Sequence, residues 1–196
     1  MNTKILSQAV VSVHIEVRPK YLVPDTNCFI DHLDRITTVT ASHVYTLMVP
    51  IVVLSELEGL SRGGKSPAPS TRSSLDPQHV RKVALAAKRA LSFLKNRPQA
   101  VKCVTTKGAV LSSTTFTTED DSMMDATFKN DDKILATCLV LSKGHREQQA
   151  VETGEPKKLV SEVVLLTDDR NLRVKALARD VPVRELVDFM QWAGLG

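Results

Sequence analysis

At 196 residues, 42% hydrophobic and 24% charged, the chain has the composition of a single globular domain with one core, and no apolar run approaches the roughly 20 residues of a membrane span. The net charge of +4 permits nucleic acid as a partner, while an aromatic content of 4% argues against a wide base-stacking platform. The three cysteines are far apart and show no zinc-ligand spacing, which argues against a disulfide framework and suits a reducing compartment.

Apolar runs of strand-like length alternate with helical periodicity along the chain. Strands are predicted at 21–24, 44–49, 101–105, 162–167 and 181–183. The first helix is predicted to begin near Asn27, which can cap it, and further helices follow at 51–60, 78–95, 131–142, 170–179 and 184–193. The run at 162–167 is apolar enough to be buried on both faces, as central parallel strands are. This order predicts an α/β fold in which helices flank a parallel sheet.

Polar segments at about 61–79, 112–130 and 143–158 are predicted to be flexible loops. The helix predicted between the first two loops carries a basic face opposite its apolar one, which either a solvated surface or a phosphate-contacting face would explain. Its basic residues are Arg81, Lys82, Lys88, Arg89 and Lys95. The N-terminus lacks the apolar region of a signal peptide, and we expect the chain to be a domain excised from a longer protein.

Four short acidic patches lie where strands or helices are predicted to begin or end. They are Val-Pro-Asp-Thr-Asn at 23–27, Leu-Ser-Glu-Leu-Glu at 54–58, Asn-Asp-Asp at 130–132 and Leu-Leu-Thr-Asp-Asp-Arg-Asn-Leu at 165–172. Open parallel sheets bind ligands at the carboxyl ends of their strands, where Asp25, Asp168 and Asp169 follow predicted strands. Asp131 and Glu56 lie on helix faces that are predicted to point inward, without a partner. Because carboxylates from distant parts of a chain converge only where a cation neutralises them, the patches predict a divalent-metal site.

The donor set predicts the metal and the reaction. Oxygen ligands without nearby histidine or cysteine select Mg²⁺ or Mn²⁺, which orient a hydroxide for in-line attack on phosphorus. We expect Asp25, Asp131 and Asp169 to hold the metal, and Glu56 to ligate through water or to orient the nucleophile. The groups expected to support these acids or to contact phosphates are Asn27, Asp132, Thr167, Asp168 and Arg170.

Each acid also has a structural explanation. Asp25 and Asp169 could cap helices, Asp131 or Asp132 could complement a helix dipole, and Glu56 could lie on the surface. These explanations weaken when all four patches must be explained together.

The four patches resemble the acidic motifs of PIN-domain ribonucleases. The resemblance is carried by Pro-Asp-Thr-Asn at 24–27, Glu56, Asn-Asp-Asp at 130–132 and Leu-Thr-Asp-Asp-Arg-Asn-Leu at 166–172. It extends from about residue 14 to the C-terminus and is nearest to the Est1-like, telomerase-binding type that supplies the endonuclease of nonsense-mediated mRNA decay. The chain departs from the family pattern at Cys28, where glycine is expected.

The resemblance implies a three-layer α/β/α PIN-like fold with a mainly parallel sheet over 14–196, preceded by an N-terminal extension at 1–13. It implies cleavage of single-stranded RNA with Mg²⁺ or Mn²⁺, in which one acid of each patch is catalytic. These acids are Asp25, Glu56, Asp131 and Asp169, with Asp132 and Asp168 as neighbours. It also implies mRNA surveillance factors as partners through the parent protein, a link to telomeres, and a location in the cytoplasm and the nucleus.

Two other functions stay open at this point. A non-catalytic RNA- or protein-binding module could use the same fold, although the complete acidic set argues against it. Residues 59–66 fit the P-loop pattern G-x-x-x-x-G-K-S of an NTPase. A P-loop needs a strand before it and a helix after it, whereas here a helix is predicted before it and Pro67 and Pro69 follow.

Overall fold

The computed structural model describes residues 14–63, 76–96, 98–111, 129–146 and 158–196, in which five strands form one sheet. The strand order is β3-β2-β1-β4-β5, and all four neighbouring pairs are parallel. The strands are β1 (His14–Pro24), β2 (Thr46–Pro50), β3 (Val101–Val104), β4 (Lys158–Leu166) and β5 (Val183–Arg184). The helices are α1 (Thr26–Ala41), α2 (Ile51–Ser61), α3 (Pro77–Lys95), α4 (Asn130–Arg146), α5 (Arg170–Leu177) and α6 (Leu186–Trp192).

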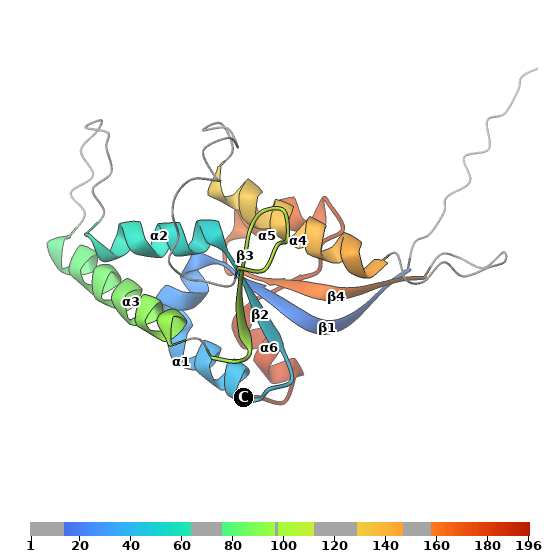
Figure 1. Ribbon diagram of the computed structural model, residues 1–196, viewed down its shortest axis with the longest axis horizontal. Helices are drawn as coiled ribbons and strands as arrows, with labels where there is room; N and C mark the ends of the chain where they lie inside the picture. Colours follow the sequence, from blue (N-terminus) through green and yellow to red (C-terminus); the bar gives the residue numbers. More distant parts are fainter. Residues whose placement is uncertain (1–13, 64–75, 97, 112–128, 147–157) are drawn as a thin grey trace, which may run out of the picture.

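Helices cover both faces of the sheet, so the predicted three-layer α/β/α fold is confirmed. Figure 1 shows α4 and α5 on one side of the sheet and α1 and α6 on the other. Helices α2 and α3 run side by side beyond β2 and β3, and α3 also packs against α1. In the described part of the chain, no helix is long and apolar enough to cross a membrane.

The core surrounds the two central strands. In β4, Val163, Val164, Leu165 and Leu166 are at most 1% exposed, which confirms the prediction of a central strand buried on both faces. In α6, Phe189 is 1% exposed, and its ring lies edge-on to Tyr45 with centroids 5.1 Å apart. Trp192, at the end of the same helix, is 59% exposed.

Two strands are longer than the sequence predicts. β1 begins at His14 rather than at residue 21, and β4 begins at Lys158 rather than at residue 162. The two added segments pair with each other in parallel, from His14 with Lys158 to Val17 with Ser161. The added segment of β1 alternates polar and apolar residues from His14 to Arg18, a strand pattern that the prediction overlooked, whereas the added segment of β4 is too short to show one.

The predicted loops are wrong at their edges. Asp76 accepts a hydrogen bond from Gln78 N at 3.0 Å, so it caps α3, which begins at Pro77 inside the loop predicted at 61–79. Helix α4 begins at Asn130 and runs to Arg146, so residues 130 and 143–146 are helical. The remainder of these loop predictions at 64–75, 112–128 and 147–157, and the extension at 1–13, lie outside the described residues.

Candidate active site

One pocket of about 470 Å³ lies at the carboxyl ends of β1 and β4. Asp25 and Asp169 reach it from the ends of these strands, Glu56 from α2 and Asp131 from α4. Its wall is completed by Thr26, Asn27, Gly59, Leu60, Ile134 and Leu172. The parallel topology therefore brings together one acid from each of the four patches.

Asp25 is the most buried of these acids, with 4% of its surface exposed. Its Oδ1 accepts a hydrogen bond from Cys28 N at 2.8 Å, so Asp25 caps α1 and the prediction that Asn27 does so is wrong. Burial raises the pKa of the Asp25 carboxyl above its ordinary value of 3.8, although hydrogen bonds from Thr167 and Cys28 act in the opposite direction. Asp25 therefore both caps α1 and lines the pocket. Its Oδ1 accepts from Cys28 N, and its Oδ2 accepts from the Thr167 hydroxyl.

The hydroxyl of Thr167 joins the ends of the two central strands. It donates to Asp25 Oδ2 at 2.5 Å and accepts from Asp169 N at 3.0 Å. Asp169 in turn caps α5, since its Oδ1 accepts from Asn171 N at 2.6 Å and from Leu172 N at 3.2 Å. Thr167 is fully buried, so one hydroxyl sets the relative position of two pocket acids.

Glu56 was predicted to lack a partner, and this prediction is wrong. Its Oε2 accepts a hydrogen bond from the Thr26 hydroxyl, and its Oε1 accepts from Asn130 Nδ2 at 2.5 Å. Both donors are polar residues of the acidic motifs, adjacent in sequence to Asp25 and Asp131. The carboxylate is thereby held between the starts of α1 and α4.

Asp131 also has a partner that the sequence did not reveal. Lys175 Nζ on α5 lies 3.3 Å from Asp131 Oδ2 and 3.1 Å from Asp132 Oδ1. These hydrogen bonds raise the pKa of Lys175, with the bond to Asp132 as the largest cause. Asp131 lines the pocket, whereas Asp132 is not part of its wall. The Lys175 ammonium contacts both acids and so links the start of α4 to α5.

The second acidic doublet shows the same division. Asp169 lines the pocket, whereas Asp168 points to His32 on α1, with 3.2 Å between His32 Nε2 and Asp168 Oδ2. Helix α1 is kinked at His32, whose φ of −135° and ψ of 32° are not helical. In each doublet, one acid lines the pocket and its neighbour contacts a basic side chain of a helix. Asp131 does both, because it lines the pocket and also contacts Lys175.

The other candidates fall into two groups. Asn27 is exposed and lines the pocket, while Arg170 is exposed at the start of α5 outside the pocket wall. Cys28, where the family pattern has glycine, is an ordinary residue of α1; its Sγ donates to Leu166 O at 3.4 Å, and burial raises the pKa of its thiol well above the ordinary value. Gly59 lies inside α2, so a helix precedes the P-loop pattern as predicted, and Gly64, Lys65 and Ser66 lie outside the described residues.

The donors of the pocket suit a hard divalent cation. All four acids offer carboxylate oxygens, the ligands that Mg²⁺ and Mn²⁺ prefer, and a cation would offset the cost of burying the Asp25 charge. Among the described residues, no three acidic, histidine or cysteine side chains lie close enough together to enclose a metal ion as they stand.

Replacing Lys175 by methionine should tighten Mn²⁺ binding about 3- to 10-fold, because an ammonium that contacts Asp131 repels a divalent ion and competes for the same carboxylate. Titration of Mn²⁺ followed by electron paramagnetic resonance measures the affinity without requiring activity. Lys143→Met at the far end of α4 is the matched control and should leave the affinity unchanged. A weaker affinity in Lys175→Met would show instead that the ammonium aligns the acids.

In EDTA, replacing Asp25 by asparagine should stabilise the domain at neutral pH. The folded pKa of Asp25 is raised, so the stability that this carboxyl contributes is present below its ordinary value of 3.8 and is lost as the pH rises through the folded value. An amide keeps the acceptor for Cys28 N and carries no charge, and its nitrogen can donate to the Thr167 hydroxyl in place of accepting from it. We expect the Tm to rise at about pH 7 and not at about pH 3.5.

Calorimetry at the two pH values measures this difference. Asp34→Asn is the control, because the Asp34 side chain is 96% exposed and has little desolvation to relieve. A lower Tm for Asp25→Asn at neutral pH would mean that the bonds of the carboxylate outweigh the cost of its burial.

A parallel α/β domain with acids gathered at the carboxyl ends of its strands is the architecture that the sequence motifs suggested. The family model for the PIN domain matches residues 22–186. The chain belongs to the PIN-domain family.

Among curated proteins, the chain is 43% identical over 190 residues to the telomerase-binding protein EST1A of Danio rerio. The match covers 94% of the chain and 12% of that relative, so the chain spans only a small part of the length of the longer protein.

Solved structures resemble the chain at lower identity. The PIN domain of human SMG5 is 14% identical with a TM-score of 0.46, covering 88% of this chain and 98% of that one. The PIN domain of T. brucei RRP44 is 13% identical with a TM-score of 0.44, covering 89% of this chain and 79% of that one. Similarity at this level carries no argument about function.

Proposed function

We propose that this PIN domain is a Mg²⁺- or Mn²⁺-dependent endoribonuclease that hydrolyses phosphodiester bonds of single-stranded RNA. The observation that supports the proposal is the pocket at the carboxyl ends of the parallel strands, in which one acid from each of four distant motifs is exposed to the same space. Those acids are Asp25, Glu56, Asp131 and Asp169. A structural role alone would require only the two helix caps, and it would not require all four acids to face one pocket.

In this proposal Asp25, Asp131 and Asp169 hold the metal, and Glu56 ligates through water or orients the nucleophile. A divalent ion held by these residues would stabilise negative charge on the phosphate and would lower the pKa of a bound water. The protein contributes fixed geometry: Thr167 sets Asp25 against Asp169, while Thr26 and Asn130 hold the two oxygens of Glu56. The acids would still have to move closer together to enclose a cation, since no three of the described acidic, histidine or cysteine side chains do so as they stand.

The biological setting of the proposal comes from similarity. Because the family resemblance points to nonsense-mediated mRNA decay, we propose mRNA as the substrate and mRNA surveillance factors as partners of a longer protein that contains this domain. The similarity to a telomerase-binding protein extends the proposal to a link with telomeres. Action on mRNA and at telomeres would place that protein in the cytoplasm and the nucleus.

The test is cleavage of an end-labelled, unstructured RNA by the purified chain with Mg²⁺ or Mn²⁺. We expect internal products with either ion, no products in EDTA, and much slower cleavage of an RNA duplex of the same sequence. Absence of metal-dependent cleavage under all of these conditions would contradict the proposal.

The second candidate function is a non-catalytic module that binds RNA or protein through the same pocket. Two observations favour it. Each pocket acid is already hydrogen-bonded or ion-paired within the protein. The described acids are also too far apart to enclose a metal ion as they stand. RNA that binds without being cut in Mn²⁺ would support this function instead.

A further inference from the structure

The outer face of α3 carries several basic side chains and no acidic one. The helix has 19 residues and contains no acidic residue. Five of its residues are exposed cations: Arg81, Lys82, Lys88, Arg89 and Lys95. The whole chain, by contrast, has 22 acidic residues against 26 basic ones, so basic residues without interspersed acids are not its general pattern.

The cations form two rows along the helix. Arg81, Lys88 and Lys95 recur every seven residues, or nearly two turns, and therefore stand about 10 Å apart in one row. Lys82 and Arg89 form the second row. The strip between the rows is neutral and consists of Gln78, Leu85 and Ser92, of which Leu85 is 61% exposed.

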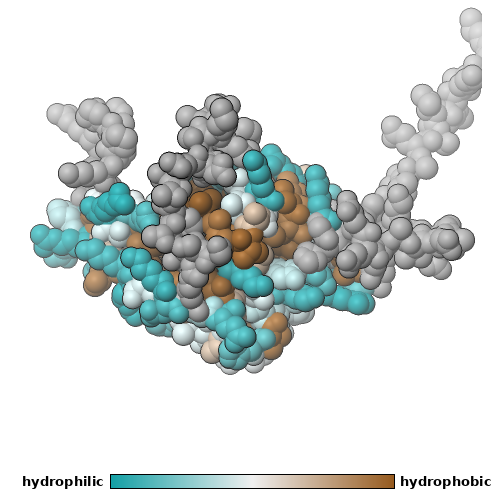
Figure 2. All heavy atoms as spheres, viewed as in Figure 1, coloured by the Kyte–Doolittle hydropathy of each residue, from teal (hydrophilic) through white to brown (hydrophobic). Residues whose placement is uncertain are grey.

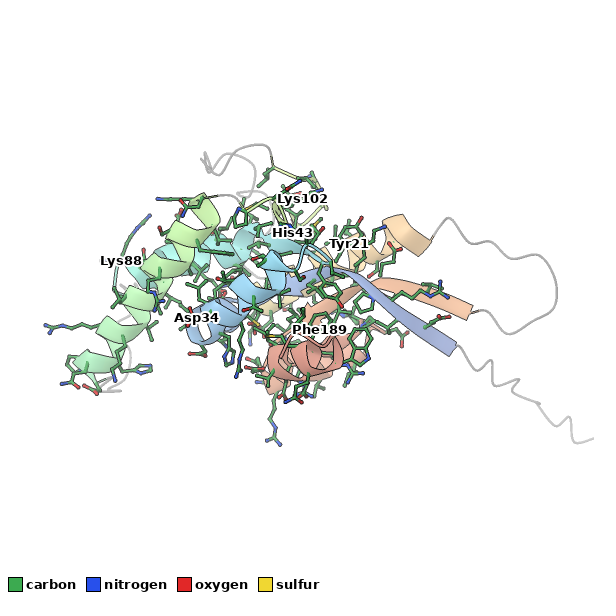
Figure 3. The ribbon with its side chains drawn as sticks, turned by 90° about the horizontal axis from the view of Figure 1, so that it is seen from below. Tyr21, Asp34, His43, Lys88, Lys102 and Phe189 are labelled. Atoms are coloured by element: carbon green, nitrogen blue, oxygen red, sulfur yellow. The ribbon has the colours of Figure 1, made fainter. Side chains whose placement is uncertain are left out.

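These side chains have few partners within the protein. Arg89 lies 3.8 Å from Asp34 of α1, a loose contact with a carboxylate that is 96% exposed. Within the described residues, no acidic side chain pairs with the three members of the first row. Figure 2 shows mostly hydrophilic side chains over the end of the molecule formed by α3, and Figure 3 places Lys88 on the side of α3 that faces away from Asp34.

The position of α3 relates this face to the pocket. Helix α3 packs along α2, the helix that provides Glu56, Gly59 and Leu60 to the pocket wall. The pocket wall follows α2 from Glu56 to Gly59 and Leu60. Figure 1 shows α3 running beside α2, so the two helices are neighbours at this end of the molecule.

We propose that the outer face of α3 binds the sugar–phosphate backbone of single-stranded RNA that flanks the bond in the pocket. The inference rests on the proposed function, and it assigns the basic face to RNA rather than to solvent. A row of flexible cations about 10 Å apart suits a polyanion without sequence preference, because it offers charge and not base recognition. An aromatic-poor chain must obtain most of its RNA affinity in this way.

The test compares binding of a long RNA of about 30 nucleotides with cleavage of a short one of about six, which offers far fewer phosphates to the α3 face. In the variant Arg81→Gln/Lys88→Gln/Lys95→Gln, the affinity for the long RNA in EDTA should fall at least about tenfold. The slope of log K against log salt should decrease by about 2, since each lost phosphate contact removes about 0.7. Cleavage of the short RNA in Mn²⁺ should not change.

The matched control removes three exposed cations elsewhere, in the variant Lys102→Gln/Lys107→Gln/Arg179→Gln. It carries the same net charge as the α3 variant and should bind the long RNA like the parent chain. Equal losses in the two triple variants, or an unchanged affinity and salt slope in the α3 variant, would overturn the inference and leave the nuclease proposal intact. Failure of the parent chain to cut either RNA would instead contradict the nuclease proposal.

Discussion

Replacing Asp25 or Asp169 by asparagine should lower the rate of cleavage of unstructured RNA in Mn²⁺ by at least about 100-fold, since even groups that only support metal ligands cost about 10- to 100-fold when removed. Both side chains line the pocket, and an amide supplies a weaker ligand without charge. Both also cap helices, and asparagine is as good a cap as aspartate. The substitution therefore keeps both helix caps, while at Asp25 it reverses the hydrogen bond with Thr167, so the folding of each variant has to be measured beside its activity.

Cleavage of an end-labelled RNA by each purified variant measures the effect, with circular dichroism and thermal unfolding as evidence of folding. Asp188→Asn provides the control, because Asp188 is an exposed acid on α6 outside the pocket wall. Full activity in both pocket variants would exclude the proposed mechanism. Loss of activity together with loss of the fold would be resolved by Glu56→Gln, which changes a pocket acid that caps no helix.

Replacing Phe189 by alanine should destabilise the domain by about 3–5 kcal/mol, the usual cost of removing a fully buried aromatic side chain. Phe189 is 1% exposed and lies between Tyr45, at 5.1 Å, and Trp192, at 5.8 Å between ring centroids. Its loss would leave a cavity between α6 and the sheet and remove both ring contacts. Urea unfolding should show a lower midpoint with an unchanged slope.

Val174→Ala is the control for this experiment. Val174 is 66% exposed on α5, so its truncation should change the free energy of unfolding by no more than about 0.5 kcal/mol. A loss below about 1 kcal/mol in Phe189→Ala would mean that α6 does not unfold together with the rest of the core.

The elements that were predicted well are those with a strong local pattern. The apolar run of β4 and the helical periodicity of α2 and α5 led to an α/β fold with a parallel sheet, and the structure confirms it. The paired ends of β1 and β4 were missed: the alternation of Ile15 and Val17 with polar residues was overlooked, and the start of β4 is too short to show a pattern without its partner strand. Helix α4 extends through Arg146 although its last turn is polar, so composition alone misplaced its end.

For the site, the sequence alone predicted which acids gather in one pocket and at which edge of the sheet they lie. An acid that follows a parallel strand can only emerge at the carboxyl edge, so Asp25 and Asp169 were placed in advance. The tertiary structure alone decided what each acid contacts. Lys175 meets Asp131, Asn130 meets Glu56, and His32 meets Asp168 through packing between helices that are distant in the chain. Such contacts leave no periodic pattern in the sequence, because they depend on how whole helices pack. They give partners to Glu56 and Asp131, which the sequence predicted to have none.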